Sequence, residues 1–499
     1  MSDPSAYLVV HGHFYQPPRE NPWTGRLERE ISAHPWHDWN ERITAECYRP
    51  NAFAHVLAQE GRIVGIVNNY AHMSFDLGPT LAGWLAREAP ETYERMREGD
   101  RDSARRRGGH GNAMAQAYSH AILPLMNDRD KRTQIRWGQA DFHARFGRPP
   151  EGMWLPEAAV DEATLDVLAE EGVRFTVLSP TQAAATRPIG SAEWVEVREA
   201  DLDTTCPYRR FHSDGSGRSV DLFFYDAGVA REVAFDRLLA RSSADFVSRF
   251  LQNGHAQRAG APPLLHIATD GESYGHRTAF GDRTLAYALT QEAQTRGLRV
   301  SNYAEYLDHH PPADEVRLRV ADGSQGTSWS CPHGLGRWTR DCGCQSGDPS
   351  WSQAWRMPLR GALDLVRDRG SAFFEDAGCE ALGGEPWTAR DRVVEWSFRP
   401  GWREEIASRH SRRALALLDM QFHGQLMYAS CGWYHSDVGG LEARIVMRQA
   451  ARMMSLWRHA GGSPPEHEFL DRLAEAHSNQ RELGTGADVY LRFARTDGT

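Results

Sequence analysis

The chain has 499 residues, of which 40% are hydrophobic and 25% are charged, and its formal net charge is -10. This length allows about two or three domains, and no apolar run approaches the ~20 residues that a membrane-spanning helix needs. The acidic balance argues against a nucleic-acid partner, because phosphate binding draws on clustered lysine and arginine side chains.

The N-terminal residues and the cysteines indicate a cellular compartment. Residues 1–14 lack the basic start and long apolar stretch of a secretion signal. Seven cysteines are an odd number in a long chain, which fits a reducing environment better than a disulfide scaffold. We therefore expect a cytoplasmic protein that associates with neither membranes nor nucleic acids. The sequence does not indicate its oligomeric state.

The first predicted strand, residues 6–10, runs directly into His11 and His13, with Gln16 close behind. Side chains at i and i+2 of an extended segment point to the same side, so the two imidazoles address one site. As sugar ligands they need only hydroxyl partners. As metal ligands they need a further carboxylate or histidine from elsewhere in the chain.

Residues 63–70 form a second apolar run, which predicts a strand ending at Asn68. In residues 108–125, Gln116 and His120 stand at i and i+4, so they share one face if this segment is helical. Residues 128–146 are typical of a charged amphipathic helix with a structural role.

Residues 153–155 predict a short strand that feeds Pro156 and Glu157. The proline restricts the turn and holds the glutamate in a narrow range of orientations, as a nucleophile requires. Alternatively, Glu157 is a carboxylate at a helix N-terminus, stabilised by the helix dipole by only ~0.3–1 kcal/mol. A helix over residues 161–172 and a strand over residues 175–178 complete a β-α-β unit.

A strand over residues 219–225 ends at Asp226, and the apolar run 264–268 breaks into a polar loop that carries Asp270, Glu272 and His276. The alternative without a catalytic role is that Asp270 caps a following helix. Alternating strands and helices across residues 6–308 predict an α/β barrel or a doubly wound sheet. The polar strand ends then open on one side, which favours an enzyme.

The alternation of predicted strands and helices ends after residue 307. A short linker and then a cysteine-containing segment follow. Cys331, His333, Cys342 and Cys344 offer four soft ligands, but their spacing is not one of the usual zinc patterns. The competing interpretations are a loop on the substrate side, and thiols packed in a tight glycine turn. We assign no metal ligand and no cofactor.

From residue 351 onward the apolar spacing is helical. Between two of these helices, Trp433 and Asp437 lie in a segment that either reaches over the barrel mouth or is simply a capped turn. The predicted organisation is a catalytic β/α barrel over residues 1–310, a linker and cysteine-containing loop over residues 311–350, and a helical domain over residues 351–499.

Three motifs resemble the signatures of glycoside hydrolase family 57: HGHFYQP at residues 11–17, WLPE at residues 154–157 and ATDGESYG at residues 268–275. The second and fifth signatures are loosely met by residues 111–120 and 433–437. The resemblance implies an α-glucan-active retaining enzyme with a distorted seven-stranded β/α barrel followed by a helical domain. It assigns the nucleophile to Glu157 and the general acid/base to Asp270. The segment CPHGLGRW…DCGC departs from the well-studied amylases and branching enzymes and looks like a less characterised subgroup.

Retention requires the two carboxyl groups to lie roughly 5–5.5 Å apart and to differ in protonation. Hydrolysis and glycosyl transfer both remain open. Tryptophans are expected to stack on sugar rings, and polar groups to hold hydroxyls. The predicted substrate-binding residues are His11, His13, Gln16, Asn68, His120, Trp154, Asp226, Glu272, His276, Trp329, His333, Arg337, Trp433 and Asp437.

Two other functions fit the same residues. A metal-dependent sugar deacylase or amidohydrolase uses Zn²⁺ bound by His11, His13 and Asp270 to activate water. A carbohydrate-binding protein without catalysis is a third interpretation, which the presence of both expected carboxylates disfavours.

Overall fold

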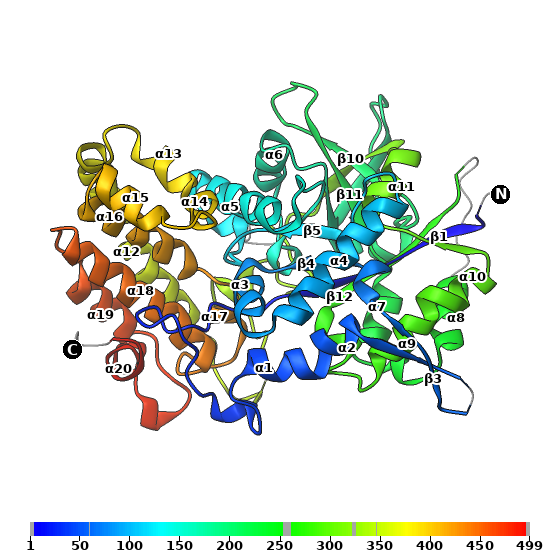
Figure 1. The fold of residues 1–499 in the computed structure, drawn as a ribbon. Coiled ribbons are helices and arrows are strands. Elements are labelled where there is room, and N and C mark those ends of the chain that lie inside the picture. The colour runs from blue at the N-terminus through cyan, green and yellow to red at the C-terminus, as the bar shows by residue number, and fades with distance from the viewer. Residues whose placement is uncertain (1–3, 59, 253–260, 322–325, 346, 496–499) are drawn as a thin grey trace. The chain divides into compact units, whose positions relative to one another are not determined.

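The computed structural model describes residues 4–58, 60–252, 261–321, 326–345 and 347–495 (Figure 1). The chain divides into two units. The first comprises Met1–Gln16, Arg29–Gln116 and Arg145–Arg319, and the second comprises Pro17–Glu28, Ala117–Ala144 and Val320–Thr499. Residues 17–28 and 117–144 thus belong to the second unit, although they lie within the range that the sequence assigns to the barrel. Among the described residues, none of the helices combines the length and the apolar character needed to cross a bilayer.

Parallel strands form the core of the first unit. Within its described residues, seven of them follow one another in the order β12 (Leu264–Asp270), β1 (Ala6–Phe14), β4 (Ser74–Leu77), β5 (Ala113–Gln116), β6 (Met153–Trp154), β7 (Phe175–Leu178) and β11 (Ser219–Phe224). Every residue of β1 is buried, as expected for a strand covered on both faces. The expected α/β barrel with parallel strands is therefore confirmed.

The barrel is distorted at two places, where neighbouring strands are joined by isolated hydrogen-bonded contacts instead of a regular ladder. A single bridge between Gly152 and Phe175 links β6 to β7. At the other joint, the Asp226 amide that follows β11 donates to the His266 carbonyl of β12 at 2.9 Å. Because regular ladders are missing at these two places, the ring of strands closes through isolated contacts.

Helices connect the strands of the first unit, as parallel pairing requires. They are α3 (Pro79–Glu88), α4 (Pro90–Arg106), α5 (Asp128–Phe146), α6 (Glu162–Glu170), α7 (Ala227–Ala234), α8 (Ser243–Gln252), α9 (Gly281–Tyr287) and α11 (Tyr303–His309). Most of α5 belongs to the second unit, and only its last two residues, 145 and 146, belong to the first. The predicted helices over residues 128–146 and 161–172 correspond to α5 and α6.

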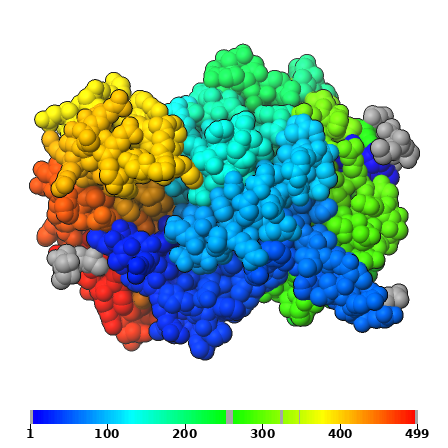
Figure 2. Space-filling model, viewed as in Figure 1, coloured from blue at the N-terminus to red at the C-terminus, as the bar shows by residue number. Residues whose placement is uncertain are grey.

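The predicted barrel strand over residues 63–70 is wrong. Residues Ile63–Val67 form β3, which pairs with β2 (Ala54–Leu57) in a two-stranded antiparallel hairpin. Ile63, Val64 and Ile66 are each more than half exposed, so this apolar run does not enter the core. The hairpin extends from the rest of its unit in Figure 1, and its residues reach the surface in Figure 2. The barrel strand is the shorter β4, which begins eleven residues after the start of β3.

The helical interpretation of residues 108–125 is also wrong. Gln116 ends strand β5, and His120 lies in an irregular segment with a φ of 59°. The two side chains therefore do not share a helix face. Gly108 and Gly109 both have positive φ and end helix α4, which lets the chain turn into a strand instead of continuing as a helix.

A second sheet extends from the barrel. Its strands run in the order β7, β11, β10 (Tyr208–Phe211), β14 (Asp314–Leu318), β8 (Ala183–Pro188) and β9 (Val195–Glu196). Strands β8, β9 and β10, which lie between β7 and β11 in the sequence, thus belong to a sheet that shares β7 and β11 with the barrel.

The second unit is helical, as expected. Its longest helix, α12 (Arg356–Leu382), packs against α16 (Arg412–Leu426), and α16 packs against α18 (Leu441–His459). The helix α19 (Glu466–Ala474) also contacts α12. Inside this unit a fully buried ion pair joins Arg390 of α13 (Pro386–Asp391) to Asp130 at 2.6 Å. The apolar spacing identified in the sequence therefore corresponds to core-facing positions.

Candidate functional site

Three polar residues stand in register at the carboxyl ends of adjacent barrel strands. His13 on β1 is the pairing partner of Asp270 on β12 and of Asp76 on β4. Parallel strands direct their carboxyl ends toward one face of a barrel, where polar side chains can be accommodated. The row Asp270, His13 and Asp76 therefore marks this end as the candidate site.

Asp76 holds both N-terminal histidines. Its carboxylate lies 3.1 Å from His11 Nε2 and 2.8 Å from His13 Nδ1, and all three residues are buried. The carboxylate can only accept, so each of these ring nitrogens carries the proton. His11 Nδ1 is then the acceptor toward the Ser74 hydroxyl at 3.0 Å. As predicted from their i and i+2 spacing, the two imidazoles address one point.

The charges in this triad are unequal. Burial opposes the ionisation of His13, but the charge and hydrogen bond of Asp76, together with Asp270 and Glu272, raise the pKa of His13 to about 9. Burial lowers the pKa of His11 in spite of Asp76. Burial also disfavours the charged form of Asp76, but the imidazoles outweigh it and lower the pKa of that carboxyl. At neutral pH these shifts favour a protonated His13, an ionised Asp76 and a neutral His11.

Trp154 stacks on both imidazoles. Its ring stacks on His11 with centroids 5.0 Å apart and on His13 with centroids 5.2 Å apart, at interplanar angles of 19° and 21°. The side chain is fully buried. The prediction that Trp154 stacks on a sugar ring is therefore wrong, because histidines occupy its face. It positions the site instead.

Glu157 sits in a strained turn directly after β6. Its φ and ψ are 58° and 21°, and the next residue, Ala158, also has a positive φ of 46°. Left-handed backbone costs roughly 1–2 kcal/mol per residue without glycine, and such strain clusters at functional sites. The Gln182 amide holds the turn by donating to the Ala158 carbonyl at 2.7 Å. Glu157 therefore lies in the turn directly after β6 that the sequence predicts, and its role as nucleophile stays a prediction.

Asp270, the last residue of β12, carries a half-exposed carboxylate that pairs with the Arg277 guanidinium at 2.6 Å. The following Gly271 packs against Phe14, and a Cβ at this position would lie 2.4 Å from ring carbon Cδ1. Only glycine therefore fits between Asp270 and Glu272. The Asp270 side chain makes no N-cap hydrogen bond to the short helical turn that follows, so the capping alternative is not supported.

Glu272 is held by two groups from elsewhere in the first unit. Tyr48 Oη donates to Glu272 Oε1 at 3.1 Å, and Gln16 Nε2 donates to the same oxygen at 3.4 Å. Gln16 Nε2 also lies 3.2 Å from Tyr48 Oη. Burial raises the pKa of Glu272, and the negative charge of Asp270 adds to this effect. Two carboxyl groups of different character thus lie two residues apart in the chain.

Three other predicted site residues of the first unit have structural partners. Both polar groups of the Asn68 amide bind backbone, Nδ2 to the Arg95 carbonyl at 2.6 Å and Oδ1 to the Tyr70 amide at 3.2 Å. Asp226 caps helix α7 by accepting from the Val229 amide at 3.0 Å. Asn68 is not at a barrel strand end, so its assignment to the substrate is wrong. His276 hydrogen-bonds Glu46.

The remaining predicted site residues lie in the second unit. His120 Nδ1 contacts Ser430 Oγ at 2.6 Å. Asp437 accepts from the Asn479 and Gly439 amides at 2.6 and 2.7 Å, which is the capped turn that the sequence left as an alternative. Trp433 is fully buried and donates to the Arg356 carbonyl, so its prediction as a sugar platform is wrong.

Three further predicted residues of this unit belong to the cysteine-containing loop. Arg337 is buried, donates to the Tyr434 and Ser330 carbonyls, and stacks on the Tyr434 ring. Trp329 is only partly buried. His333 lies beside the three cysteines of this loop.

Sequence reasoning missed Asp76, Tyr48 and Arg277. Asp76 had a detectable signal, since it ends a short strand just before Gly78 and Pro79, like the other polar strand ends. The sequence predicts the strand at residues 63–67 instead, because that run is more apolar. Tyr48 lies in the π-helical segment η2 (Thr44–Tyr48), 224 residues before Glu272. No local pattern links the two, although π-helical turns are frequent at functional sites.

The geometry does not favour the metal-dependent alternative. His11 and His13 direct the nitrogens described above at Asp76, and in the described residues the grouped potential metal ligands are Cys331, His333, Cys342 and Cys344. His11, His13 and Asp270 do not form such a group.

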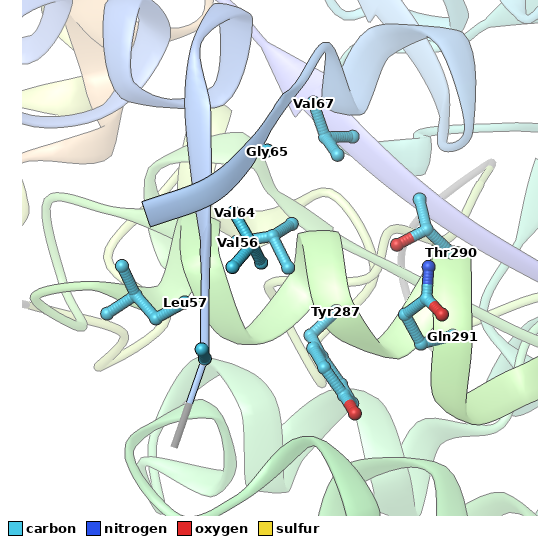
Figure 3. A pocket seen from close by; sticks show the side chains of 9 residues that line it. Val56, Leu57, Val64, Gly65, Val67, Tyr287, Thr290 and Gln291 are labelled. Carbon is cyan, nitrogen blue, oxygen red and sulfur yellow. The ribbon is translucent and has the colours of Figure 1, made fainter. Parts of the chain in front are cut away.

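A separate pocket of about 620 Å³ lies between the β2–β3 hairpin and the segment formed by α9 and η10 (Ala288–Glu292) (Figure 3). It is lined mainly by aliphatic side chains, among them Val56 and Val64, with Tyr287 and Gln291 opposite. None of its lining residues is a predicted site residue, so it is distinct from the carboxylate site.

Residues 37–319 match glycosyl hydrolase family 57, and residues 351–498 match a domain of unknown function, DUF3536. Alpha-amylase 1 of Dictyoglomus thermophilum is 27% identical over 113 residues, which cover 22% of this chain and 16% of that protein. A 1,4-alpha-glucan branching enzyme of Thermococcus kodakarensis is 23% identical over 299 residues, covering 45% of this chain and 44% of that protein. The chain thus spans less than half the length of these two relatives.

The fold also resembles a solved structure. The crystal structure of an exo-type maltose-forming amylase from Pyrococcus sp. ST04 superimposes with a TM-score of 0.68 at 15% identity, covering 94% of this chain and 83% of that one. At this identity the likeness shows the fold alone. The family match, however, extends over more than half of the chain and includes both Glu157 and Asp270. The chain therefore belongs to glycosyl hydrolase family 57.

Proposed function

We propose that this protein is a retaining enzyme that acts on α-linked glucans, with Glu157 as the nucleophile and Asp270 as the general acid/base. The observation that carries the proposal is the arrangement around His13 and Trp154. His13 is in register with Asp270, and its ring stacks on Trp154, three residues before Glu157. The two strand ends that bear the carboxylates therefore converge on one stacked pair of rings.

The named activities of the relatives support the substrate class. One is an alpha-amylase, one is a 1,4-alpha-glucan branching enzyme, and the structural neighbour is a maltose-forming amylase. All three names refer to α-glucans or their products.

In the first step, the Glu157 carboxylate attacks the anomeric carbon while Asp270 donates its proton to the glycosidic oxygen. The carbon–oxygen bond breaks, the leaving sugar departs as an alcohol, and a glycosyl ester forms on Glu157. The left-handed turn supports this role because it fixes the direction of the side chain before substrate binds.

In the second step, Asp270 removes a proton from water or from a sugar hydroxyl, which attacks the anomeric carbon and releases Glu157. Water as acceptor gives hydrolysis, and a sugar hydroxyl gives transfer. The stereochemistry is retained in both cases, because the anomeric carbon is inverted twice.

The His13 cation supplies a fixed positive charge beside Asp270. A preorganised charge in a water-poor site stabilises negative charge at little reorganisation cost. We assign to His13 a positioning role. Its positive charge holds the Asp270 carboxylate in place after Asp270 has given its proton to the leaving sugar. Gln16, Tyr48 and Glu272 are assigned to the subsite next to Asp270.

The test is turnover of maltooligosaccharides and glycogen, followed by chromatography, for the wild type and for Glu157→Gln and Asp270→Asn. Removing a group that acts in the chemical step should lower kcat by at least ~10²-fold. The matched control is Glu151→Gln, since Glu151 precedes β6 as Glu157 follows it and instead pairs with Arg174 and His110. We expect this control to keep turnover.

Trapping identifies the nucleophile directly. A 5-fluoroglycosyl fluoride should leave a covalent adduct on the peptide that contains Glu157, detectable by mass spectrometry. An adduct elsewhere, or near-wild-type turnover by Glu157→Gln, contradicts the assignment. Proton NMR of the first-formed anomer tests retention, and an inverted product excludes the covalent mechanism. Comparing new reducing ends with chain-length redistribution then separates hydrolysis from transfer.

A further inference from the structure

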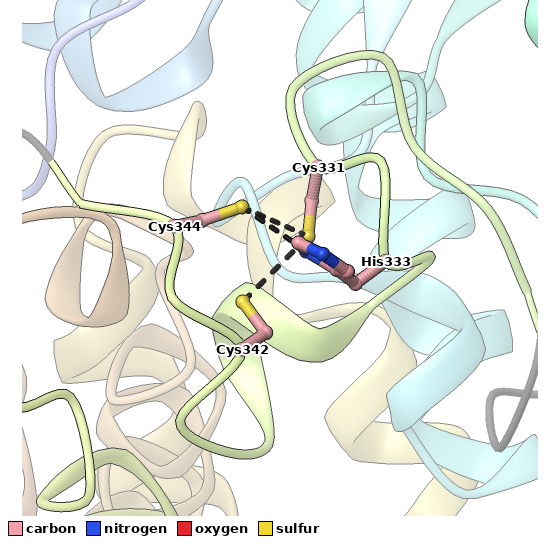
Figure 4. Close-up of side chains that lie close together, drawn as sticks. All are labelled: Cys331, His333, Cys342 and Cys344. Atoms are coloured by element: carbon pink, nitrogen blue, oxygen red, sulfur yellow. Dashed lines mark hydrogen bonds between the residues drawn. The ribbon is translucent and has the colours of Figure 1, made fainter.

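Four potential metal ligands converge in the loop around η11 (Gly336–Trp338) of the second unit, independently of the proposed function. Cys331, His333, Cys342 and Cys344 point toward one another (Figure 4), and their ligand atoms all lie within 4.8 Å of each other. The Cys331 sulfur is 3.7 Å from that of Cys344 and 3.9 Å from that of Cys342. The Cys344 sulfur is 3.4 Å from His333 Nδ1.

These separations match the edges of a tetrahedron around zinc. With Zn–S bonds of about 2.3 Å and Zn–N bonds of about 2.0–2.1 Å, tetrahedral angles give S···S edges of about 3.8 Å and S···N edges of about 3.5 Å. A disulfide would require about 2.05 Å between sulfurs. The loop therefore holds its thiols at the spacing of ligands rather than of a covalent pair.

The backbone is shaped to bring the ligands together. Gly336 lies directly beneath them, and a Cβ there would approach Cys342 Cβ to 2.8 Å and His333 Cβ to 3.4 Å. Gly343 separates Cys342 from Cys344 with a φ of 77°, a conformation that glycine adopts without steric cost. Any other residue at these positions would strain or open the cluster.

A buried arginine supplies the complementary charge. Arg356 is fully buried, and its Nη1 lies 3.9 Å from the Cys342 sulfur while Nη2 donates to the Cys344 carbonyl at 2.9 Å. Within the described ranges no carboxylate forms an ion pair with it at 4.0 Å or less. Burying an unpaired charge is costly. Three thiolates and one imidazole around Zn²⁺ carry a net charge of -1, which the guanidinium balances, and such outer contacts commonly accompany metal ligands.

We propose that Cys331, His333, Cys342 and Cys344 bind one Zn²⁺ ion in a structural site. Four protein ligands complete the tetrahedron and leave no position for a substrate, which is the mark of a structural rather than a catalytic zinc. The ligands are deprotonated on binding, so three thiol protons are released to solvent. His333 is thereby assigned to the metal and not to the sugar.

The site fastens the segment that joins the two family matches, since these end at residue 319 and resume at residue 351. Beside the ligands, Trp338 is fully buried and donates to the Ser430 carbonyl at 3.2 Å. Arg356 Nε donates to the Trp433 carbonyl at 3.1 Å, and Trp433 Nε1 donates back to the Arg356 carbonyl. The metal loop is thus anchored to α12 and to the segment 430–433.

The first test is elemental analysis of untagged full-length protein purified without added metal. We expect about one Zn²⁺ per chain, and loss of this metal in His333→Asn and in Cys344→Ser. His333 is exposed, so its replacement removes a ligand without opening a core cavity. Cys379→Ser is the matched control, because Cys379 is an exposed free thiol on α12 and should keep the full metal content.

Cobalt substitution gives a readout on the wild type alone. Zinc-depleted protein reconstituted with Co²⁺ should show the intense visible bands of tetrahedral cobalt and a near-ultraviolet thiolate charge-transfer band, both absent from Cys344→Ser. Zinc removal should also lower the thermal midpoint of the wild type but not that of a folded Cys344→Ser variant.

Three results would overturn the proposal. They are wild-type protein without metal after reconstitution, metal that persists undiminished in both ligand variants, and an intact mass 2 Da low that shows a disulfide among these cysteines. Persistence in the variants would also point to binding elsewhere, such as at His11 and His13. Because none of these measurements depends on glucan turnover, failure of the glycosidase assignment leaves the metal test unaffected.

Discussion

Asp76 Oδ2 lies 2.8 Å from His13 Nδ1, and both side chains are buried at the carboxyl ends of adjacent strands. The ion pair fixes a positive charge in register with Asp270 on the next strand. A second oxygen of the same carboxylate binds neutral His11. One aspartate thus sets the position of two imidazoles and the charge state of the one beside the proposed acid/base.

Replacing Asp76 should be among the most damaging single changes in the first unit. Asp76→Asn keeps the shape but removes the charge, leaving His13 without its main counter-ion in a buried site. Breaking a buried pair in this way costs about 3–5 kcal/mol of unfolding free energy. Urea unfolding followed by tryptophan fluorescence measures it. For the exposed pair of Arg413 with Glu380, Glu380→Gln should cost no more than ~1 kcal/mol, and equal losses would contradict the central role of Asp76.

The same pair predicts how stability changes with pH. The pKa of His13 is raised to about 9, above the 6.5 of an unperturbed histidine. Its contribution is therefore fully present below pH 6.5 and is lost as the pH rises through about 9, by at most about 3 kcal/mol. Unfolding free energies between pH 6 and pH 9.5 should fall more steeply in the wild type than in His13→Gln.

A second histidine provides the control for this titration. Burial lowers the pKa of His423 to about 4 in spite of its hydrogen bond to Gln449. It is therefore neutral throughout the window from pH 6 to pH 9.5. His423→Gln can change the stability but should leave the slope between pH 7.5 and pH 9.5 as in the wild type, because His423 is neutral there in both the folded and the unfolded state. A flattened slope in this variant, or an unchanged slope in His13→Gln, argues against the assigned charges.

The parts of the fold that the sequence predicted well have strong local signals. The strand over residues 175–178 and the helix over residues 128–146 have the predicted bounds, because apolar periodicity and charge pattern agree there. WLPE and TDGE can be identified from the sequence because, in each, a carboxylate follows directly after an apolar strand. The i and i+2 histidines were interpreted correctly for the same reason, since strand geometry alone places them on one side.

The parts that failed depend on contacts distant in the sequence. Val64 and Ile66 have the composition of a core strand yet lie in an exposed hairpin, and the place beside β1 is taken by β4. Trp154 and Trp433 have the composition of sugar platforms, but each is covered by neighbours from other segments. Whether a large ring is buried depends on tertiary contacts. The local sequence therefore could not show whether these tryptophans lie in the core or in a cleft.

Glu272 should respond to pH in the opposite sense to a normal paired carboxylate. Burial, with the charge of Asp270, raises the pKa of Glu272, so the folded state loses stability as the pH rises above the unfolded value of about 4.3. Glu272→Gln keeps an acceptor for Tyr48 and cannot ionise. Its gain in unfolding free energy over the wild type should therefore be small at pH 4 and larger at pH 7.

Glu46 offers the matched comparison for Glu272. Burial disfavours its charge, but the hydrogen bond from His276 outweighs this and lowers the pKa of Glu46. Its ionised form thus stabilises the folded state, and this contribution is present above pH 4.3 and lost in acid. Glu46→Gln should become relatively less stable than the wild type as the pH rises. The same sign of pH dependence in both variants would refute the proposed difference between the two glutamates.

The strained turn at Glu157 should separate stability from activity. Glycine adopts a φ of 58° without the side-chain clash, so Glu157→Gly should relieve ~1–2 kcal/mol of strain, offset by ~0.5–1 kcal/mol of extra chain entropy in the unfolded state. We expect an unfolding free energy equal to or slightly above that of the wild type, with glucan turnover lost. Ala158→Gly relaxes the neighbouring residue, whose φ is 46°, but keeps the carboxylate. It should match the stability of Glu157→Gly and retain measurable turnover. Loss of stability in both variants would show that the turn is not strained, and full activity of Glu157→Gly would remove this carboxylate from the reaction.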